Sequence, residues 1–119
     1  MSSISYIQYK GKKIMYVDYT HCKNPKEMIE VLEEVKREYE KTTENFVAIA
    51  DFRGNFGSSE FMKRAGQIGK EILDKRTLKT AVLGVTGIKK ILLNGYNTFV
   101  THKLVPFDTK EEALEFLIK

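Results

Sequence analysis

Residues 47–66, VAIADFRGNFGSSEFMKRAG, contain the transition that decides the fold. An almost uninterrupted apolar run, typical of a strand covered on both faces, ends at Asp51. A loop with two glycines follows, and Ser58 and Ser59 stand before a segment of helical periodicity. We therefore expect a central strand over 45–52 and a helix that begins at the serines and ends near DKRT. Its buried stripe is predicted to be Phe61, Ala65, Ile68 and Ile72.

The same alternation of strand and helix patterns continues on both sides of this stretch. Period-two patterning on either side of Gly11 predicts a hairpin over 4–20. Asn24 and Glu27 form a capping-box pattern before an amphipathic helix, and Asp108 with Glu111 forms another before the last helix. The buried stripe of the first helix is predicted to be Met28, Val31, Leu32, Val35 and Tyr39. Further along the chain we expect a strand over 78–85, a helix over 87–100 and a strand over 103–107. The order β-β-α-β-α-β-α-β-α predicts one α/β domain over residues 1–119, with a mostly parallel sheet, an antiparallel hairpin and about four helices.

The amino-acid composition limits the kinds of protein to which the chain can belong. The chain has 119 residues, 42% of them hydrophobic and 30% charged, as in ordinary globular domains. Cys22 is the only cysteine, so an intrachain disulfide and a four-cysteine zinc site are excluded, and a reducing cytoplasm is expected. No stretch is apolar enough to predict a secretion signal or a membrane span. We expect no cofactor.

The net charge of +4 is distributed unevenly. Residues 61–103 contain nine Lys or Arg against only Glu71 and Asp74. Such a segment can attract phosphate groups, lipid headgroups or an acidic protein, although a solvated lysine-rich surface is the simpler reading.

The loop and helix start after Asp51 form the candidate site. A serine there is foremost an N-cap, contributing about 1 kcal/mol. The free N–H groups of a helix N-terminus also suit a bound or covalent phosphate, and nearby basic side chains, Arg64 among them, would add positive charge. The predicted phosphorylation or anion site consists of Ser58, Ser59, Asp51, Arg53, Gly57 and Lys63.

Catalysis and metal binding have weaker support. GNFGSSE is neither a nucleophile elbow nor a P-loop, and only His21 and His102 could serve as an imidazole base. His21 and Cys22 are adjacent but lack further ligands nearby, so we expect neither a metal site nor enzymatic activity.

The predicted helix over 87–100 has apolar residues around most of its circumference. Most of them are expected in the core, but the stripe is wide enough to leave an outer edge for a partner or ligand. The candidate interaction or ligand surface consists of Lys89, Lys90, Leu93 and Tyr96.

The element order, ADFRG at residues 50–54, VLGVTGIKKILLNGYN at 82–97 and KLVPFDTKEEALEFL at 103–117 resemble the STAS fold of anti-sigma-factor antagonists. Within that group the chain is similar to stand-alone SpoIIAA-like (STAS/SEC14-type) proteins. The resemblance implies a four- or five-stranded mixed sheet and a regulatory or ligand-sensing domain.

In the antagonist branch, a serine just after the central strand accepts phosphate from a kinase partner. The resemblance places Ser58 or Ser59 there and Asp51 at the strand-terminal acidic position. The antagonists have Asp and Ser close together, whereas Phe52 to Gly57 separate them here. The longer loop fits a branch that kept the fold and changed the site.

Three functions remain open from the sequence. The first is a protein-interaction module, with or without a phosphorylation switch. The second, suggested by the SEC14 side of the resemblance, is a domain that binds a small anionic or lipid ligand. The third, nucleic-acid binding, has no supporting motif and is not expected. The edge strands of so small a sheet would also allow a homodimer.

Overall fold

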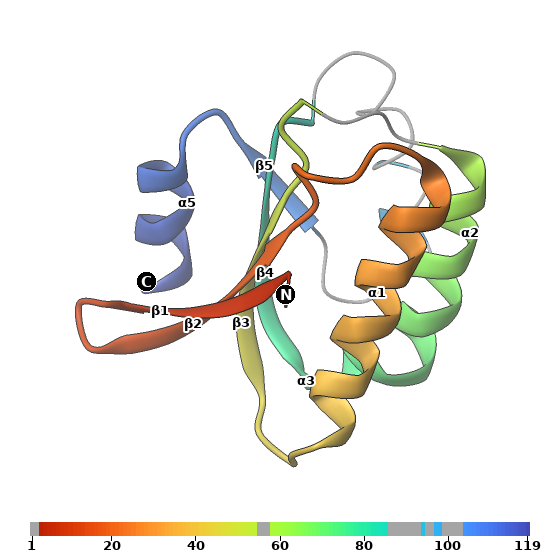
Figure 1. Ribbon diagram of the computed structural model, residues 1–119. Helices are drawn as coiled ribbons and strands as arrows, with labels where there is room; N and C mark the ends of the chain where they lie inside the picture. The colour runs from red at the N-terminus through yellow and green to blue at the C-terminus, as the bar shows by residue number, and fades with distance from the viewer. Residues whose placement is uncertain (1–2, 55–57, 86–93, 95–96, 99–103) are drawn as a thin grey trace.

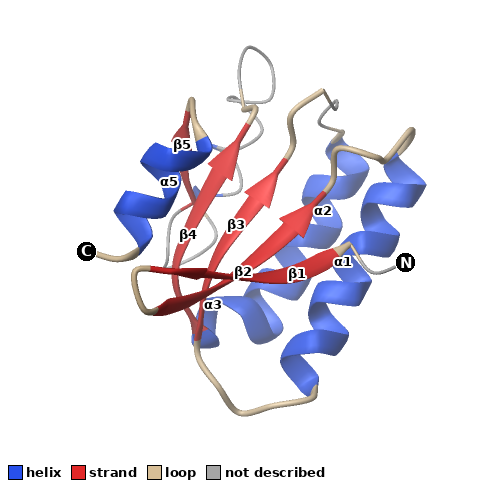
Figure 2. Ribbon diagram, turned by 60° about the vertical axis from the view of Figure 1, so that its left-hand side comes forward, coloured by secondary structure: helices blue, strands red, loops and turns tan. Residues whose placement is uncertain are grey.

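The computed structural model describes residues 3–54, 58–85, 94, 97–98 and 104–119. Within these residues the chain forms one five-stranded sheet of order β1-β2-β3-β4-β5 (Figure 2). β1 is antiparallel to β2, and the other neighbouring pairs are parallel. The mixed α/β sheet predicted from the sequence is therefore confirmed. The strands are β1 (Ile4–Tyr9), β2 (Lys12–Asp18), β3 (Phe46–Asp51), β4 (Thr77–Leu83) and β5 (Leu104–Phe107).

A two-residue turn joins β1 to β2. Lys10 and Gly11 both have positive φ, 48° and 83°, as the tight hairpin turn that suits strand twist requires. Tyr9 pairs with Lys12 immediately before and after the turn. The predicted hairpin is confirmed.

Helix α1 (Pro25–Glu40) begins as its sequence indicates. The Asn24 side chain accepts a hydrogen bond from the Glu27 backbone N–H at 2.9 Å, and Pro25 occupies the first turn, where a missing N–H costs nothing. The Glu27 carboxylate accepts from the Lys23 backbone N–H at 2.6 Å. All five residues of the predicted apolar stripe are buried.

Helices cover both faces of the sheet (Figure 1). α1 and the helical run after β3 lie on one face, and α5 (Lys110–Leu117) lies on the other. That run consists of α2 (Ser59–Ile68), the π-helical turn η1 (Gly69–Leu73) and α3 (Asp74–Arg76), so the predicted end near DKRT is confirmed. Two apolar cores result, one between the sheet and α1/α2 and one between the sheet and α5.

The last helix is capped by Thr109, which accepts from the Glu112 backbone N–H at 3.2 Å, so the capping box predicted at Asp108 and Glu111 is wrong by one residue. The helix predicted over 87–100 lies outside the described residues except for positions 94 and 97–98. The described part has three helices of eight residues or more, fewer than the four expected. No helix in this part is long and apolar enough to cross a membrane.

Candidate functional site at the carboxyl edge of the sheet

Asp51, the last residue of β3, is a fully buried carboxylate. Its Oδ2 accepts hydrogen bonds from the Tyr16 hydroxyl at 2.5 Å and from Arg53 Nη2 at 2.7 Å. Its Oδ1 accepts from the Arg53 backbone N–H at 3.1 Å and from Nε at 3.0 Å. Both oxygens are thus satisfied by β2 and by the start of the loop that follows β3. A buried charge is stable when it is paired and hydrogen-bonded in this way.

Electrostatics keep Asp51 ionised. Burial opposes ionisation, but the hydrogen bonds from Arg53 and Tyr16 outweigh it, and the pKa of Asp51 lies below its ordinary value. Burial, together with the hydrogen bond to Asp51, raises the pKa of Tyr16 to about 12. The hydrogen bond to Asp51 also raises the pKa of Arg53. At neutral pH the cluster is therefore a carboxylate, a phenol and a guanidinium, and none of the three is poised to exchange a proton.

The loop after Asp51 is held against the end of β4. The Phe52 backbone N–H donates to the Leu83 carbonyl at 2.9 Å. Gly84 has φ +78°, and a Cβ built on it would lie 2.5 Å from the Arg53 backbone nitrogen. Only glycine permits both this backbone conformation and this close approach. The Phe52 ring stacks on Tyr19 with centroids 4.5 Å apart, which holds the loop on the α1/α2 face of the sheet.

Ser58 is the N-cap of α2. It has extended backbone, and its hydroxyl oxygen accepts from the Phe61 backbone N–H at 3.1 Å. The prediction that one of the two serines caps this helix is confirmed. Ser59 is the first residue of the helix.

The basic residues predicted around this helix start are differently engaged. Arg53 binds Asp51, as described above. Arg64 forms an ion pair with Glu33 of α1, with Nη2 and Oε1 2.5 Å apart. Lys63 is exposed, and among the described residues no ion pair involves it. Asp51 and Arg53 are thus brought together as a pair, while Arg64 serves the contact between α1 and α2.

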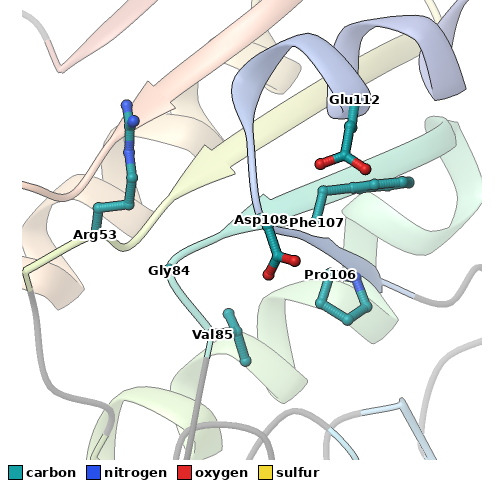
Figure 3. Close-up of a pocket in the computed structure, with 7 residues that line it drawn as sticks. All are labelled: Arg53, Gly84, Val85, Pro106, Phe107, Asp108 and Glu112. Carbon is teal, nitrogen blue, oxygen red and sulfur yellow. The ribbon is translucent and has the colours of Figure 1, made fainter.

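A surface pocket of about 370 Å³ opens where β3, β4 and β5 end and α5 begins (Figure 3). The carboxyl ends of parallel strands are where ligands bind in open α/β sheets. Its walls combine apolar groups with the carboxylates of Asp108 and Glu112, while the guanidinium of Arg53 points away from Asp108. The lining residues are Arg53, Gly84, Val85, Pro106, Phe107, Asp108 and Glu112. Sequence reasoning missed this pocket, although the convergence of strand ends 51, 83 and 107 at one edge follows from parallel pairing.

Comparisons with known proteins agree with this architecture. No protein-family model and no curated protein matches the chain. A solved structure does: an uncharacterized protein from the DUF3478 family with a SpoIIAA-like fold, from Shewanella loihica PV-4. The match has a TM-score of 0.60 and covers 96% of this chain and 91% of that chain, at 18% sequence identity. The chain has a SpoIIAA-like fold. The fold class inferred from the sequence resemblance is thus confirmed, and the likeness concerns the fold alone.

Some of the predicted site residues lie in the described part of this SpoIIAA-like fold, and others lie outside it. Asp51, Arg53, Ser58, Ser59 and Lys63 lie on β3, on the loop that follows it and on α2. Gly57 and the predicted interaction surface lie outside the described residues; that surface consists of Lys89, Lys90, Leu93 and Tyr96.

The adjacent residues His21 and Cys22 both make structural contacts. His21 Nε2 lies 2.8 Å from the Ser3 hydroxyl oxygen. Burial, reinforced by nearby carboxylates, raises the pKa of the Cys22 thiol to about 11, which keeps it protonated and a poor metal ligand at neutral pH. In the described part of the chain no three His, Cys, Asp or Glu side chains are grouped so that they could hold a metal ion.

Proposed function

We propose that this chain is a non-enzymatic regulatory module that acts by binding a protein partner, and that phosphate on Ser58 or Ser59 changes this binding. One observation carries the proposal: in a SpoIIAA-like fold, a capped helix N-terminus follows the buried end of the central strand. The STAS resemblance of the sequence associates this place with phosphorylation.

The two serines would respond differently to phosphate. On Ser58 the phosphate would use the oxygen that now accepts from Phe61 N–H, so it would replace an existing cap with a charged one. On Ser59 it would add negative charge to the first turn and leave that cap in place. In both cases the positive end of the helix dipole favours the phosphate, while Glu60 in the same turn opposes it.

The test uses extracts of the native host as the source of kinase. The purified protein, Ser58→Ala, Ser59→Ala and the double variant are incubated with extract and ATP, and phosphosites are mapped by mass spectrometry. Ser5→Ala, which changes an exposed serine of β1, is the matched control. We expect modification at 58 or 59 that disappears only in the corresponding variant and in the double variant. Modification elsewhere, or none, would exclude the switch.

The partner is tested separately, by affinity purification with the phosphorylated and unphosphorylated protein as bait. We expect a protein that is retained by one form at least several-fold better than by the other. Equal retention by both forms would leave a binding module without this regulation. Retention of a small molecule and no protein would favour the second function below.

The second candidate function is binding of a small ligand, and the pocket at the carboxyl edge favours it. The sequence suggested an anionic or lipid ligand held near residues 87–100. The described pocket instead contains two carboxylates, and its guanidinium is already paired with Asp51. This lining, with Phe107 and Pro106 as apolar walls, suits an organic ammonium better than an anion.

Two probes of similar length and opposite charge distinguish these ligands. Thermal unfolding is followed with cadaverine, a diamine, and with glutarate, a dicarboxylate. We expect cadaverine to raise Tm and the double variant Asp108→Asn, Glu112→Gln to lose the shift, because a ligand of the native state stabilises it. A rise in Tm with glutarate alone would favour an anionic ligand instead. No change in Tm with either probe would contradict ligand binding in this pocket.

A further inference from the structure

One wall of the pocket at the carboxyl edge also supports the loop that leads to α2. Gly84 lines the pocket (Figure 3), and the same residue packs against the backbone of Phe52 and Arg53. A Cβ added to Gly84 would lie 2.5 Å from the Arg53 nitrogen, so there is no space between the two segments. The Phe52 backbone N–H also donates to the Leu83 carbonyl at 2.9 Å. A shift of the wall at the end of β4 must therefore move the backbone of Phe52 with it.

Three aromatic rings connect this loop to the first turn of α2. The Phe52 ring stacks on Tyr19 and meets the ring of Phe61 edge-on, with centroids 5.8 Å apart. The rings of Tyr19 and Phe61 are also edge-on, at 5.4 Å. All three pack in the core beneath α1 and α2, where close packing transmits a shift of one side chain to its neighbours. These contacts reach α2 directly from Phe52, without the residues between the loop and Ser58.

The cap of α2 lies at the end of these contacts. Phe61 is the residue whose backbone N–H donates to the Ser58 hydroxyl oxygen, and Ser58 is half-buried. A kinase has to reach this oxygen and place a catalytic carboxylate beside its proton. We therefore expect the first turn of α2 to open before Ser58 is modified. The closed and open forms of this turn are the two states whose balance a distant contact can change.

We propose that the pocket wall at Gly84 controls phosphorylation of Ser58, because the wall holds the cap of α2 closed through the ring of Phe52. The inference rests on the proposed function, since it concerns the regulation of the same serine. A reaction that needs a transiently open segment proceeds at a rate set by the open fraction. Loosening the wall raises this fraction, and a ligand that tightens the wall lowers it. Because coupling is reciprocal, opening the cap also loosens the wall.

Hydrogen exchange of the Phe61 amide measures opening of the cap without a kinase. Gly84→Ala changes the wall, and Phe52→Leu removes the ring that connects the wall to the cap. Each should speed exchange of the Phe61 amide about fivefold relative to the Ile49 amide of the central strand, which reports on unfolding of the whole sheet. Phe46→Leu is the matched control and should leave this ratio unchanged. It alters a buried ring of the same core at the opposite end of β3.

The reverse measurement starts from the serine. Ser58→Ala removes the acceptor of the cap, and it should speed exchange of the Phe52 amide, which donates to the Leu83 carbonyl at the wall. Circular dichroism shows whether each variant is folded, and if Gly84→Ala is not, Phe52→Leu and Ser58→Ala decide. Unchanged exchange of the Phe61 amide in the folded wall and ring variants, or of the Phe52 amide in Ser58→Ala, overturns the coupling.

Phosphorylation by extract of the native host tests the consequence for Ser58. Variants in which the Phe61 amide exchanges faster should be modified at Ser58 faster by a similar factor, as followed by mass spectrometry over time. A modified Ser58 whose rate is the same in all variants overturns this inference and leaves the proposed function standing. Modification of Ser59 alone has the same meaning. Absence of phosphate from both serines in every protein contradicts the proposed function and this inference with it.

Discussion

Asp51 shows how a single residue can look reactive in sequence and be structural in the fold. A carboxylate at the end of a central strand suits a site, but here both oxygens are bound by Tyr16 and Arg53. The group connects β2, β3 and the loop that leads to α2. Asp51 therefore lies next to the candidate site because its hydrogen bonds support the loop that leads to α2.

Replacing this carboxylate tests the support directly. Asp51→Asn should lower the free energy of unfolding by about 1–3 kcal/mol in urea denaturation, because the amide cannot satisfy both partners inside the protein. Asp108→Asn, at an exposed carboxylate, is the control and should change it by less than about 0.5 kcal/mol. Because the folded-state pKa of Asp51 is lowered, the difference between wild type and Asp51→Asn should shrink as the pH falls through that pKa. Equal stability of the two proteins at pH 7 would show that the pair contributes nothing.

Tyr16 makes the complementary prediction at alkaline pH. Its folded-state pKa of about 12 exceeds the ordinary value, so its contribution is complete below about pH 10 and is lost as the pH rises through 12. Stability of the wild type should therefore fall more steeply between pH 10 and 12 than that of Tyr16→Phe, as measured by urea denaturation at each pH. Other tyrosines titrate in both proteins, so only the difference between the two curves is informative. Parallel curves would contradict the raised pKa.

The sequence predicted that Ser58 or Ser59 caps the helix and that the apolar run of the central strand ends at Asp51, because both features depend on local pattern. It did not predict the Tyr16 partner. That contact depends on the register of β2 against β3, in which Tyr16 lies opposite Ile49 and therefore diagonal to Asp51 on the same face. Register between distant strands is fixed by packing of the whole sheet, which no local pattern contains.

At the scale of elements, the start of α2 depends on the end of β4. Gly84 packs against the backbone of Phe52 and Arg53, so the loop before α2 is positioned by a residue that follows a different strand. A change at Gly84 should therefore disturb the candidate phosphorylation site without touching either serine.

Two glycines give opposite predictions for the same substitution. Gly84→Ala should lower the free energy of unfolding by about 1–3 kcal/mol, because its φ is positive and its Cβ would collide with backbone. Gly66→Ala should raise it by about 0.5–1 kcal/mol, because Gly66 lies within α2 and a Cβ there meets nothing within 4 Å. Chemical denaturation of both variants provides the measurement. If Gly84→Ala left the free energy of unfolding unchanged, the loop after β3 would have to be positioned by contacts other than this close approach.

The cap of α5 illustrates the limit of sequence reasoning for elements. Asp108 and Thr109 are both good caps, and each has a glutamate three residues later, so the pattern fits two starts equally well. The structure selects Thr109 because β5 ends at Phe107 and Asp108 remains in the turn. Boundaries of this kind depend on where the neighbouring element stops.

For the whole molecule, the alternation of strand and helix patterns was sufficient to predict a mixed α/β sheet, and the resemblance of the sequence to the STAS group supplied the SpoIIAA-like fold. Buried strands with short connections to amphipathic helices allow few topologies once crossovers must be right-handed. The pocket was not predicted, because it is formed by three strand ends and a helix that are brought together only in the complete fold. The helices also divide the interior into two cores, and the second depends on α5 alone among the described helices.

The second core yields a prediction about α5. Leu117→Ala should lower the free energy of unfolding by about 2–5 kcal/mol, because Leu117 is fully buried against the sheet. Leu78→Ala, at a leucine of β4 that is 55% exposed, should change it by less than about 0.5 kcal/mol. Thermal and urea unfolding of both variants test the difference. A small effect at Leu117 would mean that α5 is dispensable for stability.

The sequential strand order has a consequence for biosynthesis. Each strand lies beside the one that precedes it in the chain, so the sheet can be assembled in the order in which a ribosome delivers it. Among the described helices, only α5 covers the face shared by Ile14, Ile49 and Leu83, and it is the last of them to emerge. We therefore expect the core beneath α1 and α2 to form on the ribosome before the core beneath α5, and the apolar face that waits for α5 is where we expect a chaperone to bind.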